Sequence, residues 1–242
     1  MRLSLSALLC LIAALVAQHA EAQSRARIFD IELGSPVAAL PANEWVDPSC
    51  GTNGGPPSLR LDTFADFARC PAEKETALHE VWFIYDNEWE YIARAYRDPA
   101  EIARFSANVF YGQPIVTSLL IDDAGLVQGY RFVTDPRAPT DLRLVAHTLT
   151  TIVKGQFRDG TWQCTDEPPA DREQPVDGTF VKQDCAMVSA DRVTLLQGRL
   201  LRKAGQGDFR IAEGYFESST RLEVFARVAI RDAPCCRAFV PR

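Results

Sequence analysis

Alternation of apolar and polar residues, the pattern of a strand with one buried face, recurs along much of this chain. It is clearest in the stretches 115–121 and 126–133, which flank a short turn where Gly125 can adopt a positive φ. These two stretches predict a β-hairpin. Alternation, or enrichment in β-branched and aromatic residues, predicts further strands at 29–33, 79–86, 89–96, 179–188, 192–202 and 220–230.

One long stretch, 140–154, follows the period of an α-helix instead. Its apolar residues recur every three or four positions, as on the buried side of a helix packed on a sheet: Leu142, Val145, Ala146, Leu149, Ile152 and Val153. Brief helices are predicted at 37–40, 59–68 and 98–105. These elements together predict an α+β protein with a mostly antiparallel, twisted sheet of about seven or eight strands, one long helix and several short helices.

Six cysteines follow the N-terminal segment, and four of them border the turn-rich stretches 43–57 and 160–178. The simplest pairing joins neighbours in sequence: Cys50 with Cys70, and Cys164 with Cys185. Each bridge would staple a loop and restrict the unfolded chain by about 3 kcal/mol. The adjacent Cys235 and Cys236 leave three alternatives open, since they can bond to each other, pair with upstream cysteines or remain available to another molecule.

The first 22 residues have the three parts of a secretory signal peptide. A positive charge at Arg2 precedes an apolar run, and small residues stand at Ala20 and Ala22, before Gln23. The apolar run is much shorter than the roughly 20 residues that span a bilayer. We therefore expect cleavage after residue 22, a periplasmic or secreted location, and no transmembrane span in the processed chain.

The remainder, 23–242, is expected to form a single α+β domain. Its halves, 23–135 and 136–242, echo each other loosely in the order of their elements, which leaves a duplication open. The net charge is −6, and the Lys and Arg residues are dispersed among acidic ones. Nucleic acids and anionic lipids attract clustered cations, so neither is expected as a partner.

Motifs of catalysis, cofactor binding and metal binding are missing from this remainder. The glycine-rich stretch 51–57 ends in two prolines, not in the Gly-Lys-Ser/Thr of a phosphate-binding loop, and predicts turns. His79-Glu80 lacks the second histidine of H-E-x-x-H, and Asp122-Asp123 lacks the spacing of a calcium loop. We therefore predict no cofactor, no metal ion and no assigned catalytic residue.

The most unusual local feature is the stretch 82–91, in which aromatic residues surround three carboxylates. The plainer interpretation places the aromatic side chains in the core and the carboxylates at a hairpin tip. The alternative is a ligand site, in which Trp89 and Tyr91 stack on sugar rings near Asp86. Glu88 and Glu90 would share one strand face there, and two carboxylates about 5 to 9 Å apart can hydrolyse a glycoside.

The leading hypothesis is an exported, disulfide-stabilised, non-enzymatic binding module of the bacterial periplasm or cell envelope. It would bind an envelope protein or a cell-wall ligand through its sheet face, or through the loops bearing Cys50 and Cys164. Two alternatives stay open. One is a glycan-acting hydrolase that uses Glu88 and Glu90, and the other is an inhibitor of a secreted enzyme.

Overall fold

The computed structural model describes residues 27–85, 91–92, 95–97, 108–203, 206 and 215–229. The strands of this part of the chain are β1 (Trp45–Cys50), β2 (His79–Tyr85), β3 (Val109–Phe110), β4 (Gln113–Ile121), β5 (Val127–Thr134), β6 (Gln163–Asp166), β7 (Val181–Val188), β8 (Arg192–Leu201) and β9 (Glu217–Ala226).

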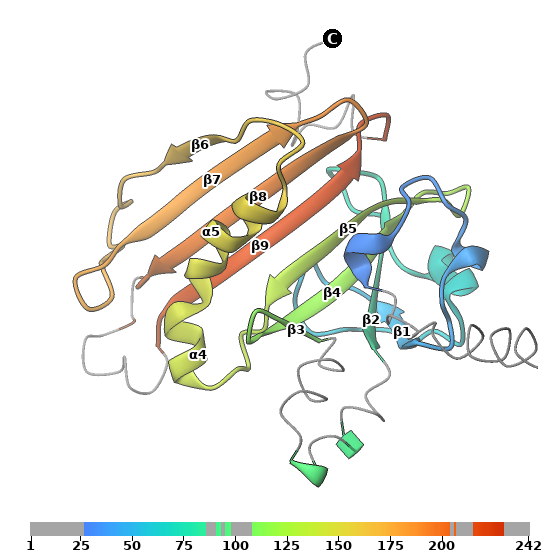
Figure 1. Ribbon diagram of the computed structural model, residues 1–242, viewed down its shortest axis with the longest axis horizontal. Coiled ribbons are helices and arrows are strands. Elements are labelled where there is room, and N and C mark those ends of the chain that lie inside the picture. The colour runs from blue at the N-terminus through green and yellow to red at the C-terminus, as the bar shows by residue number, and fades with distance from the viewer. Residues whose placement is uncertain are drawn as a thin grey trace, which may run out of the picture.

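All pairs of neighbouring strands are antiparallel. The described strands form one nine-stranded sheet in the order β1-β2-β4-β5-β9-β8-β7-β6, with β3 beside β4 (Figure 1). The predicted α+β class and antiparallel sheet are therefore confirmed, and the strand count is higher than expected.

The predicted hairpin is confirmed, and the predicted strands 179–188 and 192–202 form a second hairpin. The turn between β4 and β5 contains Gly125 at φ +78°, and β7 and β8 pair from Val181–Leu200 to Val188–Val193. The predicted strand 220–230 is β9, which lies between β5 and β8 and so joins the hairpins into one sheet.

Four local predictions were wrong, two of them at the ends of the sheet. Strand β1 lies within the predicted loop 43–57, and β6 lies within the predicted loop 160–178. Both lack a strong alternating pattern and are ordered by pairing with one neighbour, β1 with β2 and β6 with β7.

The expected strand at 29–33 is instead a 3-10 turn, η1 (Ile28–Asp30). Within the expected strand 89–96, the described residues 91–92 and 95–96 are helical.

The predicted long helix is confirmed with a break in its middle. It consists of α4 (Thr140–Val145) and α5 (Leu149–Gln156), joined by the 3-10 turn η4 (Ala146–Thr148). At the break, the hydroxyls of Thr148 and Thr150 donate to backbone carbonyls three residues earlier, an arrangement that bends helices. The helix crosses β8 and β9, where a Cβ on Gly198 would lie only 2.8 Å from Thr150 Cγ2.

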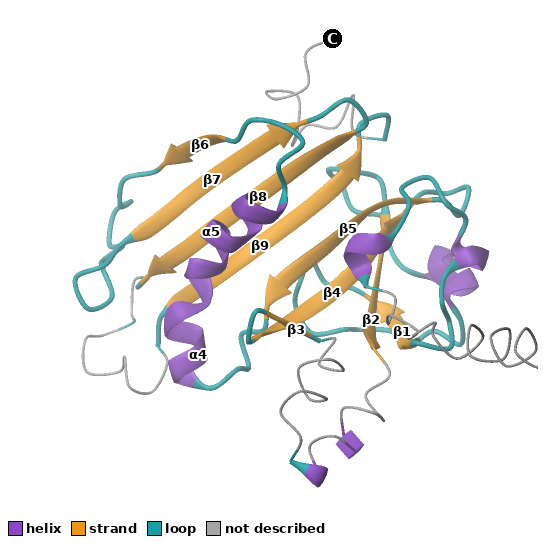
Figure 2. Ribbon diagram, viewed as in Figure 1, coloured by secondary structure: helices purple, strands orange, loops and turns teal. Residues whose placement is uncertain are grey.

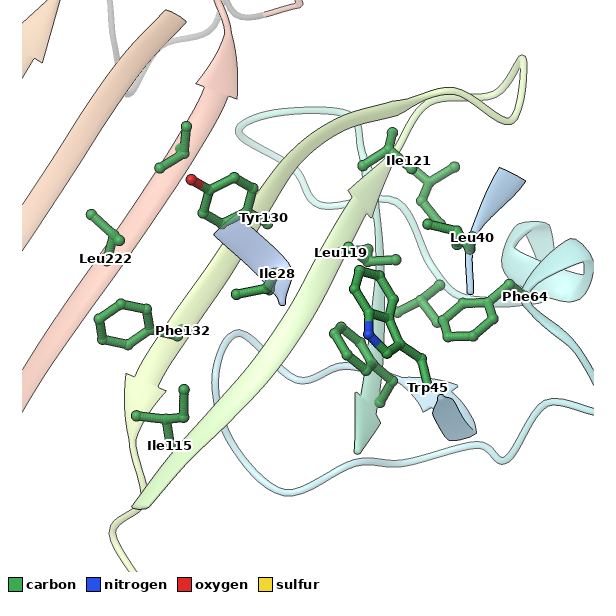
Figure 3. Close-up of a cluster of buried hydrophobic side chains, with 14 of the residues drawn as sticks. Ile28, Leu40, Trp45, Phe64, Ile115, Leu119, Ile121, Tyr130, Phe132 and Leu222 are labelled. Carbon is green, nitrogen blue, oxygen red and sulfur yellow. The ribbon is translucent and has the colours of Figure 1, made fainter. Parts of the chain in front are cut away.

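The short helices η2 (Val37–Ala39) and η3 (Phe64–Arg69) replace the predicted helices 37–40 and 59–68. They lie with η1 and α5 on one side of the sheet, which we call the helix face (Figure 2). Its core includes the stack of Trp45 on Phe83, with ring centroids 4.4 Å apart, and Ile28, whose N–H donates to Tyr85 Oη at 2.6 Å (Figure 3).

The two predicted local disulfides are present. Cys50–Cys70 joins the end of β1 to the residue after η3, and Cys164–Cys185 joins directly paired residues of β6 and β7. Cys235, Cys236 and the predicted signal peptide lie outside the described residues. Within the described ranges, no helix is long and apolar enough to cross a membrane.

We expect the two disulfides to contribute unequally to stability. Their sequence separations, 20 and 21, are nearly equal, so replacing either pair by alanine should cost about 3 kcal/mol of chain entropy. Cys50 and Cys70 are both buried, whereas Cys164 is exposed. The double variant Cys50→Ala/Cys70→Ala should therefore lower the urea midpoint more than Cys164→Ala/Cys185→Ala does. Equal midpoints, or the reverse order, would contradict this ranking.

Candidate functional site

A buried arginine lies near the centre of the sheet, on the side opposite the helix face. Arg131 is in β5, and its side chain is only 3% exposed. Its guanidinium contacts Glu73 at 2.8 Å, Glu80 at 2.9 Å and Glu223 at 2.7 Å. We call these four residues the Arg131 network. A buried guanidinium is costly unless its charge is paired and its N–H groups are hydrogen-bonded, and here both conditions are met.

Strand register brings most of this network together. Arg131 in β5 pairs directly with Glu223 in β9, and strand alternation places both on the face opposite Tyr130 and Phe132. Glu80 reaches the guanidinium from β2, two strands away on the other side. We call this side of the sheet the loop face, because the loops 51–57 and 72–78 cover part of it.

The loop 72–78 supplies the remaining carboxylate. Glu73 follows Cys70 closely, so the Cys50–Cys70 disulfide ties this loop to β1. One oxygen of Glu73 accepts a hydrogen bond from Arg131, and the other accepts one from Thr76 Oγ1 at 2.8 Å. The position of Glu73 therefore depends on both the disulfide and the loop's own hydrogen bonds.

The glycine-rich loop 51–57 closes over Glu80. The backbone N–H of Asn53 and that of Gly54 both donate to the Glu80 carboxylate, the second at 3.2 Å. Gly54 has φ +84°, and a Cβ there would lie 2.4 Å from a methyl group of Val133, so glycine is required. The loop does bind an anion through its backbone, and that anion is a side chain of the same protein.

A second arginine links this loop to the network. Arg221 in β9 donates to the Asn53 carbonyl at 2.8 Å and to Glu223 at 2.8 Å. Burial disfavours the charged form of Glu223, but Arg131 and Arg221 outweigh it and hold the pKa of that carboxyl below its usual range. A catalytic acid needs a raised pKa, so the shift of Glu223 favours charge pairing over proton donation.

Beside the network, the loop face is hollowed. The hollow has a volume of about 530 Å³. Its lining is Asn53, Glu73, Lys74, Glu75, Thr76, Arg131, Leu195, Gln197, Arg221, Glu223 and Phe225. Lys74 and Glu75 are exposed at the rim, and Leu195 and Phe225 add apolar surface from β8 and β9. The arrangement can hold a ligand that presents both charged and apolar groups.

The residues expected to form a site at 82–91 are only partly described. Asp86, Glu88, Trp89 and Glu90 lie outside the described residues, and Tyr91 is helical and 73% exposed. The part of the stretch within β2 supports the interpretation as core, because Phe83 and Tyr85 are buried.

The histidine of the incomplete zinc motif makes structural contacts. The two ring nitrogens of His79 lie 2.6 Å from the Cys70 carbonyl and 2.9 Å from Asp123 Oδ1. No cluster of three or more His, Cys, Asp or Glu side chains suited to a metal ion occurs in the described part of the chain.

Sequence analysis missed the Arg131 network. The alternating pattern of 220–230 predicts water, or a helix covering part of it, on the strand face that carries Arg221 and Glu223, yet both side chains are mostly buried. Loops cover this face of the strand. The sequence did contain one indication of a buried ion pair: Arg131 and Glu80 are isolated charges in largely apolar strands, and charges are stable in a core only when they are paired.

Replacing Arg131 should be strongly destabilising. The variant Arg131→Met leaves carboxylates buried without their cation, which typically costs about 3–5 kcal/mol. The matched control, Arg69→Met, removes an exposed ion pair with Asp62 and should cost at most about 1 kcal/mol. Urea unfolding measures both values, and a cost for Arg131→Met as small as that of the control would contradict the assigned role.

Glu223 should make stability depend on acid pH. Its pKa is lowered in the folded state, so its contribution is complete above the unfolded pKa of about 4.3 and is lost as the pH falls through the folded value. The unfolding free energy of the wild type should fall below about pH 4.3. In Glu223→Gln this acid-dependent loss should be smaller; equal losses in the two proteins would refute the assignment.

Comparison with known proteins adds no relative. No family model matches this chain, and neither a curated protein nor a solved structure matches it.

Proposed function

We propose that this chain is an exported, disulfide-stabilised, non-enzymatic binding module that binds a protein of the bacterial envelope in the hollow on the loop face. The observation that carries the proposal is the hollow itself, built against the Arg131 network over β5, β8 and β9. The two disulfides are compatible with an exported domain.

The surroundings of the hollow are suited to binding without large rearrangement. Arg131 fixes β2, β5, β9 and the loop 72–78 to one another, and Arg221 fixes the loop 51–57 to β9. A surface held in this way loses little conformational entropy when a ligand binds. The network therefore supports recognition by a preformed surface.

The lining has the composition of a protein-binding surface. Apolar surface from Leu195 and Phe225 adjoins the polar group of Gln197, and the charges of Lys74 and Glu75 lie at the rim. Protein interfaces combine an apolar centre with a polar, solvated rim in this way. The opposite charges at the rim favour a partner segment that carries both signs.

The state of the carboxylates at this site also favours binding as the function, and not glycan hydrolysis. Each glutamate of the Arg131 network is ion-paired with a guanidinium, and the pKa of Glu223 is lowered. Hydrolysis of a glycoside needs one carboxyl group that is protonated at the working pH. The network does not provide such a group at Glu223.

Site-specific photocrosslinking tests the proposal. With the photoreactive p-benzoylphenylalanine in place of Gln197, irradiation of intact cells should give one discrete protein adduct. The same replacement at Val145, an exposed residue of α4 on the helix face, is the matched control and should give none. Absence of an adduct from position 197, or equal adducts from both positions, would contradict the proposal. An adduct with a secreted enzyme would identify the module as an inhibitor.

A further inference from the structure

A second, smaller hollow lies on the helix face, behind the strand that carries Arg131. It has a volume of about 240 Å³. Its lining includes Phe29, Phe110, Tyr130, Phe157, Arg27 and Arg192, with Tyr111 and Gln156 at its edge. Tyr130 and Arg131 are neighbours in β5 and point to opposite faces, so this hollow is separate from the site proposed above.

Aromatic rings form the apolar part of this hollow. The centroid of the Phe29 ring lies 5.2 Å from that of Phe110, 6.0 Å from that of Tyr130 and 6.3 Å from that of Phe157. Phe29 belongs to η1, which the Ile28 N–H to Tyr85 Oη hydrogen bond holds against the sheet. The aromatic wall is therefore assembled from four separate parts of the chain and is fixed in place.

The Tyr130 hydroxyl is a hydrogen-bonding group that this wall leaves available. Tyr130 is only 2% exposed, and within the described part of the chain its hydroxyl has no hydrogen-bond partner. Burial is the main cause that raises the pKa of this hydroxyl, so it stays protonated and can donate to an acceptor. Tyr130 lines the hollow, so its hydroxyl can donate a hydrogen bond to a ligand acceptor there.

The charges that line this hollow are both positive. Arg27 and Arg192 contribute to its lining, whereas the carboxylates that pair with them, Asp30 and Asp159, do not. Asp159 accepts from Arg192 Nε at 2.8 Å and lies 2.6 Å from Nη2. Within the described residues, these contacts leave Arg192 Nη1 without a partner. Its guanidinium also lies 5.8 Å from the centroid of the Phe157 ring, which keeps the cation beside the aromatic wall.

We infer that the hollow on the helix face binds a small monocarboxylate that bears one aromatic ring or a short apolar tail. The apolar part packs among Phe29, Phe110 and Phe157. The carboxylate accepts hydrogen bonds from the Tyr130 hydroxyl and the Arg192 guanidinium, the type of charge-assisted pair that guanidinium groups form with carboxylates. The volume limits the ligand to about the size of a single substituted ring, since drug-sized ligands need roughly 300 Å³ or more.

Calorimetric titration of the processed chain with 3-phenylpropionate tests this inference. We expect saturable binding with one site per chain. The neutral isostere 3-phenylpropanamide should bind at least about tenfold more weakly, because hydrogen bonds to a charged group are the stronger ones. Absence of binding by 3-phenylpropionate at about 10 mM, or equal affinity for the acid and the amide, would overturn the inference.

Three variants place the bound carboxylate. Tyr130→Phe keeps the ring and removes only the donor, and Arg192→Gln removes the cation. Each should weaken 3-phenylpropionate binding about tenfold. Arg199→Gln is the matched control, because Arg199 lies in β8 like Arg192 but pairs with Asp184 on the loop face. The affinity of this variant for 3-phenylpropionate should stay at the wild-type value.

Urea unfolding of each variant separates loss of the site from loss of the fold. If Arg192→Gln fails to fold, Tyr130→Phe still decides the outcome, since it changes no packing volume. Wild-type affinity in folded Tyr130→Phe would overturn the inference, and so would an equal loss in Arg199→Gln.

Discussion

The need to compensate one buried charge constrains much of this structure. Arg131 can lie in the centre of a sheet only because Glu73, Glu80 and Glu223 surround it. These partners come from β2, from β9 and from the loop after Cys70, so the network joins strands of both predicted halves of the chain. A shift of β9 by one residue would move Glu223 to the opposite face and leave the arginine underpaired.

The same alternation gives β5 two different chemistries. Arg131 and Glu223 are charged and lie on the loop face beside apolar Val133 and Phe225, whereas Tyr130 and Phe132 face the aromatic side beneath η1 and α5. A central strand that buries a charge on one face and aromatic rings on the other can therefore support a separate hollow on each face of the sheet. The covering segments differ accordingly, with helices over the apolar side and hydrogen-bonded loops over the charged side.

The disulfides act where secondary structure is weakest. The loops that border the charged hollow contain few apolar residues and depend on hydrogen bonds to Glu80 and on the Cys50–Cys70 bridge. The edge strand β6 is exposed along its whole length, and Cys164–Cys185 ties it to β7. In both cases a covalent bond replaces the packing that such short segments cannot supply.

The sequence by itself determined the elements that follow from local periodicity and local pairing. The hairpin of β4 and β5, the helix at 140–154 and the two short-range disulfides all depend on residues that are close along the chain. Only the tertiary structure decided which charges meet. Arg131 finds its partners Glu73 and Glu223 at 58 and 92 positions away, because strand order and register set such contacts and no local period encodes them.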